Sequence, residues 1–161
     1  TLVERCGEMQ VTTPAGGATA ISYRLPWDPM HHLAVVFGDI RDGEDVPVRF
    51  HSENVIEDVF GSRCALDRAI ARIGEGKRGV IVYLREGSVG VGHHDRTRPQ
   101  GNEDHEEARR RESEWREIGL GAQILKDLGV NSIRLMASRE RHYVGVEGFG
   151  IRIVATDILD N

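Results

Sequence analysis

An apolar run that follows an amphipathic pattern most constrains the fold of this chain. In residues 59–73, VFGSRCALDRAIARI, the apolar residues Leu66, Ile70 and Ile73 recur at the spacing of one helical face. The glycine-rich stretch GEGKRG ends this predicted helix. Residues 78–86, RGVIVYLRE, follow it as an almost continuously apolar segment, which predicts a buried strand. The domain is therefore expected to combine helices with strands.

Short strands come first along the chain, and helices alternate with strands after them. ATAISYRL, HHLAVVFGDI and VPVRFHS are predicted strands, separated by turns at residues 26–29 and 41–45. A polar stretch is predicted to begin a helix near Asn102 or Glu103, and IGLGAQILKDLGV is a second amphipathic helix that ends at Gly129. SIRLMAS and GIRIVAT are predicted strands, and RERHYVGVEGFG between them is predicted to be a short helix or a loop. The expected fold is α+β, a mixed α/β arrangement with N-terminal strands followed by alternating helices and strands.

Composition narrows the class of protein. The chain has 161 residues, enough for one domain over residues 1–161, with 39% hydrophobic and 29% charged residues. A formal net charge of −5 argues against nucleic acid as a partner, and the basic stretch ARRRESEWR is interleaved with acids. No apolar run approaches the roughly 20 residues of a membrane span, and no signal-peptide pattern opens the chain. We expect a cytoplasmic protein in which Cys6 and Cys64 are free thiols.

Several motifs in order along the chain resemble GTP cyclohydrolase II. They are VVFGDI, the R-x-H-S-E motif at residues 49–53, YLREGSVGVG, EWREIGLGAQILKDLGVNSIRL and the closing VEGFGIRIV. R-x-H-S-E together with GAQILKDLGV is the most specific part of the match. The resemblance implies the fold of that family, a homodimer and a small-molecule nucleotide as the ligand. It also implies opening of the imidazole ring of GTP by zinc-activated water, release of formate and pyrophosphate, and a link to riboflavin biosynthesis.

The zinc site that the resemblance implies is incomplete in this sequence. The family holds zinc through three cysteines, and the matching positions here are Asn54, Cys64 and Leu66. One thiolate cannot hold Zn²⁺ usefully or lower the pKa of a bound water. We expect no metal ligands and no cofactor, apart from Mg²⁺ accompanying a triphosphate substrate. A site rebuilt from other residues is the alternative, with the candidates His51, His93, His94, His105 and Asp67.

The resemblance also assigns catalytic and nucleotide-binding residues. Arg116 stands at the family's nucleophilic arginine, and Glu114 stands where an aspartate is usual. His51 is a candidate acid or base beside these two. The expected nucleotide-binding residues are Arg49, Ser52, Glu53, Glu86 and Gly87. Other family positions are changed: Ser88 replaces an arginine, ASRERH (137–142) replaces T-N-N-P-x-K, and no tyrosine lies between Tyr83 and Tyr143.

Three functions are compatible with these residues. The favoured hypothesis is a zinc-independent hydrolase acting on a purine nucleotide or a related heterocycle, in a specialised biosynthetic pathway. The second is a non-catalytic nucleotide-binding or partner homologue, because a fold can outlast its chemistry. The third is a true GTP cyclohydrolase II of riboflavin synthesis with a rebuilt metal site.

Overall fold

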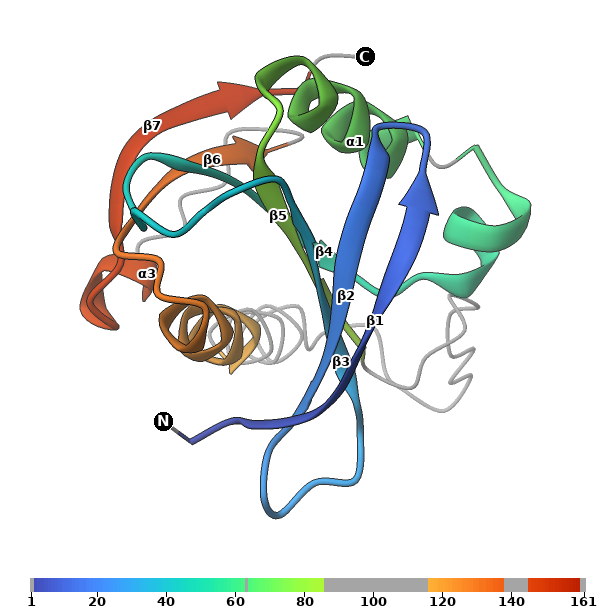
Figure 1. Ribbon diagram of the computed structural model, residues 1–161. Helices are drawn as coiled ribbons and strands as arrows, with labels where there is room; N and C mark the ends of the chain where they lie inside the picture. Colours follow the sequence, from blue (N-terminus) through green and yellow to red (C-terminus); the bar gives the residue numbers. More distant parts are fainter. Residues whose placement is uncertain (1, 63, 86–115, 138–144, 160–161) are drawn as a thin grey trace, which may run out of the picture.

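The computed structural model describes residues 2–62, 64–85, 116–137 and 145–159. Its centre is a seven-stranded sheet with the order β1-β2-β3-β5-β4-β6-β7 (Figure 1). The strands are β1 (Glu4–Thr13), β2 (Gly16–Arg24), β3 (His32–Phe37), β4 (Val46–Ser52), β5 (Gly79–Leu84), β6 (Ser132–Ala137) and β7 (Arg152–Ile158). The helical segments are η1 (Ile56–Phe60), α1 (Cys64–Gly76), residues 116–127 and α3 (Gly145–Gly148).

The sheet is antiparallel on one side and parallel on the other. β1, β2, β3 and β5 pair in antiparallel fashion, whereas β5, β4, β6 and β7 run parallel. The prediction of a mixed α/β fold is confirmed. In such a sheet the carboxyl ends of neighbouring parallel strands meet at one edge, the usual position of a ligand site. The ends of β4 and β5 therefore define where the site residues are expected.

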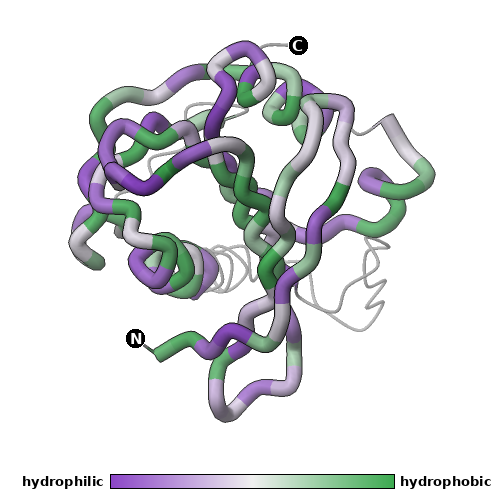
Figure 2. The backbone as a smooth tube through the Cα atoms, in the orientation of Figure 1, coloured by the Kyte–Doolittle hydropathy of each residue, from purple (hydrophilic) through white to green (hydrophobic). Residues whose placement is uncertain are grey.

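The strand predicted from RGVIVYLRE is β5, and it lies between β3 and β4. Five of its six residues are buried, because a strand with neighbours on both sides and apolar layers on both faces has no solvated side. Figure 2 shows β5 mainly in green, whereas β1 begins in purple. An apolar run of this length fits only the middle of the sheet.

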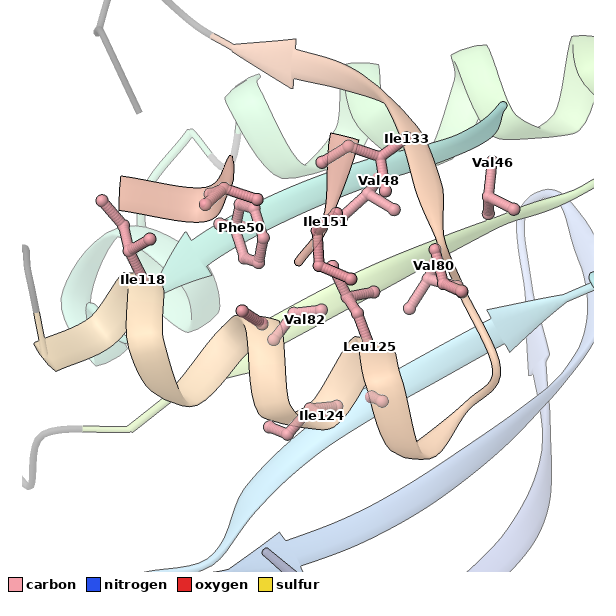
Figure 3. Close-up of a cluster of buried hydrophobic side chains, with 14 of the residues drawn as sticks. Val46, Val48, Phe50, Val80, Val82, Ile118, Ile124, Leu125, Ile133 and Ile151 are labelled. Atoms are coloured by element: carbon pink, nitrogen blue, oxygen red, sulfur yellow. The ribbon is translucent and has the colours of Figure 1, made fainter. Parts of the chain in front are cut away.

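Each face of the sheet is covered by a helix. Helix 116–127 packs on one face, where Ile118, Ile124 and Leu125 meet the valines of β4 and β5 (Figure 3). α1 packs on the other face through Ala69 and Ile73. Two separate apolar layers result, and they fix the sheet from both sides.

Two elements differ from the prediction. β1 was not predicted, because its residues are polar and almost all exposed, as an edge strand allows. The helix predicted over residues 59–73 is divided, since η1 ends at Phe60 and α1 begins at Cys64. α1 ends at Gly76, inside the predicted stop GEGKRG, and Lys77 follows it with a φ of 64°.

Candidate functional site

Alternate residues at the end of β4 face opposite sides of the sheet. Phe50 belongs to the apolar layer under helix 116–127, and Ser52 faces the same way. The Ser52 hydroxyl donates a hydrogen bond of 2.8 Å to the carboxylate of Glu117 in the first turn of that helix. His51 points to the opposite face. The R-x-H-S-E motif therefore serves two different environments.

His51 is part of a cluster with Asp58 and Tyr83. His51 Nε2 lies 2.8 Å from Oδ1 of Asp58, and the Tyr83 hydroxyl donates to Oδ2 of Asp58 at 2.5 Å. The backbone N–H of Asn54 also donates to Oδ2, at 3.1 Å. His51 and Tyr83 are paired residues of β4 and β5, and their rings stack with centroids 5.4 Å apart. The Asp58 carboxylate on η1 is thus fastened to two neighbouring strands.

The hydrogen bonds at Asp58 favour its ionised form. Burial by itself raises the pKa of Asp58, but the bonds from Tyr83, His51 and Asn54 outweigh burial and hold that pKa below its ordinary value. Burial and the bond to Asp58 together raise the pKa of Tyr83, which stays a neutral donor. The cluster therefore contains one carboxylate that only accepts hydrogen bonds.

Glu53, a predicted nucleotide-binding residue, pairs with an arginine that the sequence analysis did not single out. Arg85 Nε donates to Oε2 of Glu53 at 2.6 Å, and the Glu53 side chain is only 6% exposed. The backbone N–H of Arg85 donates to Nδ1 of His32, a buried histidine whose pKa is lowered mainly by burial. This pair joins the carboxyl ends of β4 and β5.

Arg49, predicted to meet a phosphate, is buried in the sheet rather than exposed at its edge. Its side chain follows the same direction as His51, and its NH1 donates to the backbone carbonyl of Met136 on β6 at 3.3 Å. This bond ties β4 to β6. Contact between Arg49 and a phosphate stays a prediction.

The predicted catalytic pair is only partly described. Arg116 is an exposed residue at the start of helix 116–127, next to the Glu117 that accepts from Ser52. Glu114, Glu86 and Gly87 lie outside the described residues, as do the candidate histidines 93, 94 and 105. The structure therefore brings the Arg116 segment against the Ser52 face of β4, not against the His51 face.

Two of the three positions matched to zinc cysteines have other roles in the structure. The side-chain oxygen of Asn54 accepts from the backbone N–H of Glu57 at 3.1 Å, in the first turn of η1. Leu66 packs against the apolar cluster under α1. Within the described ranges, no group of three His, Cys, Asp or Glu side chains is arranged to hold a metal ion. An amide already bonded to a helix and a hydrocarbon side chain do not fit a catalytic zinc site.

Asp58, Tyr83 and Arg85 are the site residues that the sequence analysis missed. Each of them lies near a motif residue in the folded chain. The spacing between the two residues in the sequence does not match a helical or strand period, so it does not predict the contact. Tyr83 alone had a usable signal, since it precedes the last residue of a buried strand, where side chains reach a ligand edge.

Comparison with known proteins decides the family. The GTP cyclohydrolase II family model matches residues 4–157. The chain belongs to the GTP cyclohydrolase II family. The bifunctional riboflavin biosynthesis protein RIBA 1, chloroplastic, of Arabidopsis thaliana is 40% identical over 95% of the chain. The riboflavin biosynthesis protein RibBA of Bacillus cereus is 39% identical over 96% of it.

These relatives are longer proteins. The chain spans 31% of the Arabidopsis protein and 42% of the Bacillus protein. A solved structure with the same fold is a two-domain 3,4-dihydroxy-2-butanone 4-phosphate synthase from A. baumannii, with a TM-score of 0.57 and 24% identity. The match covers 96% of this chain and 41% of that one, and it supports the mixed α/β fold.

Two findings bear on the cellular location of the chain. Among the described residues, no helix is long and apolar enough to cross a membrane. Plant relatives carry the word chloroplastic in their names. The cytoplasmic location stays a prediction.

Proposed function

We propose that this chain is a zinc-independent hydrolase of the GTP cyclohydrolase II type, acting on a purine nucleotide or a related heterocycle. The proposal is supported by the contacts of two residues that the resemblance matches to zinc cysteines: Asn54 is bonded to η1, and Leu66 is packed under α1. A histidine–aspartate pair lies next to Asn54, whose backbone N–H donates to Oδ2 of Asp58, and His51 Nε2 is 2.8 Å from Oδ1 of Asp58. His51 and Asp58 are therefore able to perform acid–base chemistry, whereas Asn54 and Leu66 provide no thiolate to bind zinc.

The proposal assigns the chemistry to two faces of β4. His51, backed by Asp58, acts as acid or base on one face. Arg116, with Glu114, binds or attacks a phosphate on the other. Nucleotide contacts come from the strand ends and the segment after β5, through Arg49, Ser52, Glu53, Glu86 and Gly87. A guanidinium near phosphate oxygens stabilises the charge that develops during cleavage.

The names of the relatives suggest the kind of metabolic pathway in which this chain acts. Their names place them in riboflavin biosynthesis. We propose a related specialised pathway for this chain, a homodimeric state, and neither nucleic acid nor membrane as a partner. Light scattering on the purified chain measures the oligomeric state directly, and a monomer would contradict that part of the proposal.

The deciding experiment is turnover with and without a chelator. The purified chain is incubated with GTP, other purine nucleotides and related heterocycles, each with and without EDTA, and the products are identified by mass spectrometry. Where the substrate is a triphosphate, Mg²⁺ is added back in excess, because EDTA removes it as well. We expect a product that persists after zinc removal and a zinc content far below one per chain.

A matched pair of histidine variants connects this activity to the site. His51→Gln removes the proposed base, whereas His31→Gln changes an exposed histidine that contacts Ser22. We expect His51→Gln to lower kcat about 100-fold, and His31→Gln to leave it within about 2-fold. Stoichiometric zinc lost together with activity would favour a rebuilt metal site. Ligand binding without turnover would favour a non-catalytic homologue.

A further inference from the structure

Asp58 receives three hydrogen bonds in the candidate site. The donors are His51, the Tyr83 hydroxyl and the Asn54 backbone N–H. The Asp58 side chain is 7% exposed, so these protein groups replace most of its water. A buried carboxylate with three donors stays ionised and can only accept.

The ionised carboxylate determines which nitrogen of His51 carries the proton. Nε2 lies 2.8 Å from a group that only accepts, so Nε2 must be the N–H donor. In the neutral ring Nδ1 then has a free lone pair. Nδ1 is buried, and among the described residues it has no hydrogen-bond partner.

Tyr83 limits the orientation of the His51 ring. The two rings are stacked with an interplanar angle of 16°, and the Tyr83 hydroxyl holds Asp58 from the other side. The His51 side chain is 12% exposed, so the ring cannot turn without breaking these contacts. His51 and Tyr83 each precede the last residue of their strand, at the ligand edge of the sheet.

We propose that Asp58 and Tyr83 are positioning residues that hold His51 as the Nε2–H tautomer, leaving Nδ1, which is buried in the free chain, to accept a proton from the attacking water once substrate binding gives that water access to it. This inference rests on the proposed hydrolase function. As the water oxygen bonds to the carbon or phosphorus under attack, its proton passes to Nδ1. The imidazolium then returns that proton to the nitrogen or oxygen of the bond that breaks. Asp58 stays ionised and stabilises the imidazolium.

The chain contains a matched pair for the test. Tyr23 donates its hydroxyl to Asp127 at 2.7 Å, which repeats the tyrosine–aspartate contact of Tyr83 and Asp58. Among the described residues, Asp127 also accepts from Arg5 and contacts no histidine. Removing the Tyr23–Asp127 contact should affect only the stability of the protein. Removing the Tyr83–Asp58 contact should affect its stability, the tautomer of His51 and kcat.

The experiment measures GTP hydrolysis and the ring nitrogens of His51 by ¹⁵N NMR, with the His51 signals assigned by their loss in His51→Gln. We expect the wild type to show a protonated Nε2 and an unprotonated Nδ1. Asp58→Asn should mix the tautomers and lower kcat about 100-fold with little change in KM. Tyr83→Phe should lower kcat about 10-fold. Asp127→Asn and Tyr23→Phe should leave kcat within about 2-fold and the His51 signals unchanged.

The outcomes separate this inference from the proposed function. An active wild type whose kcat and tautomer are unchanged by Asp58→Asn and Tyr83→Phe overturns the inference and leaves the hydrolase standing. A proton on Nδ1 in the wild type overturns it as well. A wild type that hydrolyses no GTP, with the tautomer lost only in the Asp58 and Tyr83 variants, keeps the positioning role and removes the proton transfer. Should Asp58→Asn not fold, the comparison of Tyr83→Phe with Tyr23→Phe decides.

Discussion

Gly43 shows how one residue can join two distant segments. It lies in the turn before β4 with a φ of +69°, and its carbonyl oxygen accepts from the backbone N–H groups of Asn131 and Ser132 at 2.7 and 3.1 Å. A Cβ at this position would collide with the carbonyl oxygen of Gly129. Glycine is needed here for both its conformation and its small size.

Gly43→Ala is therefore expected to destabilise the protein by about 2–4 kcal/mol, because strain and collision add. Gly17→Ala is the control, since a Cβ at Gly17 meets nothing within 4 Å. That change should alter the free energy of unfolding by less than about 1 kcal/mol. Urea denaturation of both variants measures the difference, and equal effects would contradict the close approach.

At the scale of elements, a polar contact ties the β1–β2 hairpin to helix 116–127. Asp127 accepts from Arg5 Nε on β1 and from the Tyr23 hydroxyl on β2, both at 2.7 Å. Burial raises the pKa of Asp127, but these two hydrogen bonds outweigh it and hold that pKa below the ordinary value. The contact joins the edge of the sheet, where apolar burial is small, to the body of the molecule.

The Asp127 contact should make stability depend on pH in the acid range. A carboxyl group with a lowered folded pKa contributes stability above the unfolded pKa of about 3.9, and loses it as pH falls through the folded value. At pH 7, Asp127→Asn should cost about 1–3 kcal/mol. The difference from the wild type should shrink as pH falls below about 4. Thermal unfolding across pH 3–7 tests this, and a constant difference would show that Asp127 is not ionised in the contact.

At the scale of the whole molecule, two apolar layers carry the fold, and the edge strands of the sheet are more exposed. Leu125 is fully buried between helix 116–127 and the sheet, whereas Val154 on edge strand β7 is 49% exposed. The free energy that a side chain contributes through burial should therefore be large in the apolar layers and small on the edge strands.

Leu125→Ala should cost about 3 kcal/mol, because the sheet and helix cannot both collapse into the space left behind. Val154→Ala should change the unfolding free energy by less than about 0.5 kcal/mol. Chemical denaturation provides both values. Similar losses in the two variants would mean that the helix is not packed as described.

The sequence predicted the elements whose residues are buried in a regular pattern. β5 and helix 116–127 follow from an apolar run and from a helical period, and both patterns are local. β1 could not be found this way, because an edge strand is held by its pairing with β2 and needs no apolar pattern. The break at Gly61 was missed because its apolar neighbours continue the helical spacing.

The motif R-x-H-S-E marked the site, but the partners of its residues came only from the fold. Asp58 is 7 residues from His51, and Tyr83 is 25 residues from Asp58. Their contacts depend on the pairing of β4 with β5 and on the placement of η1 beside both strands. The spacing of these three residues in the sequence does not predict that their side chains are in contact.

Local patterns in the sequence by themselves determined the mixed α/β class, the buried central strand and the family motifs, because periodicity and residue chemistry are properties of short segments. The tertiary structure alone decided which face of β4 each motif residue serves, and which groups hold His51. Hydrogen bonds at 2.5–3.1 Å form only between groups that the folded chain brings together.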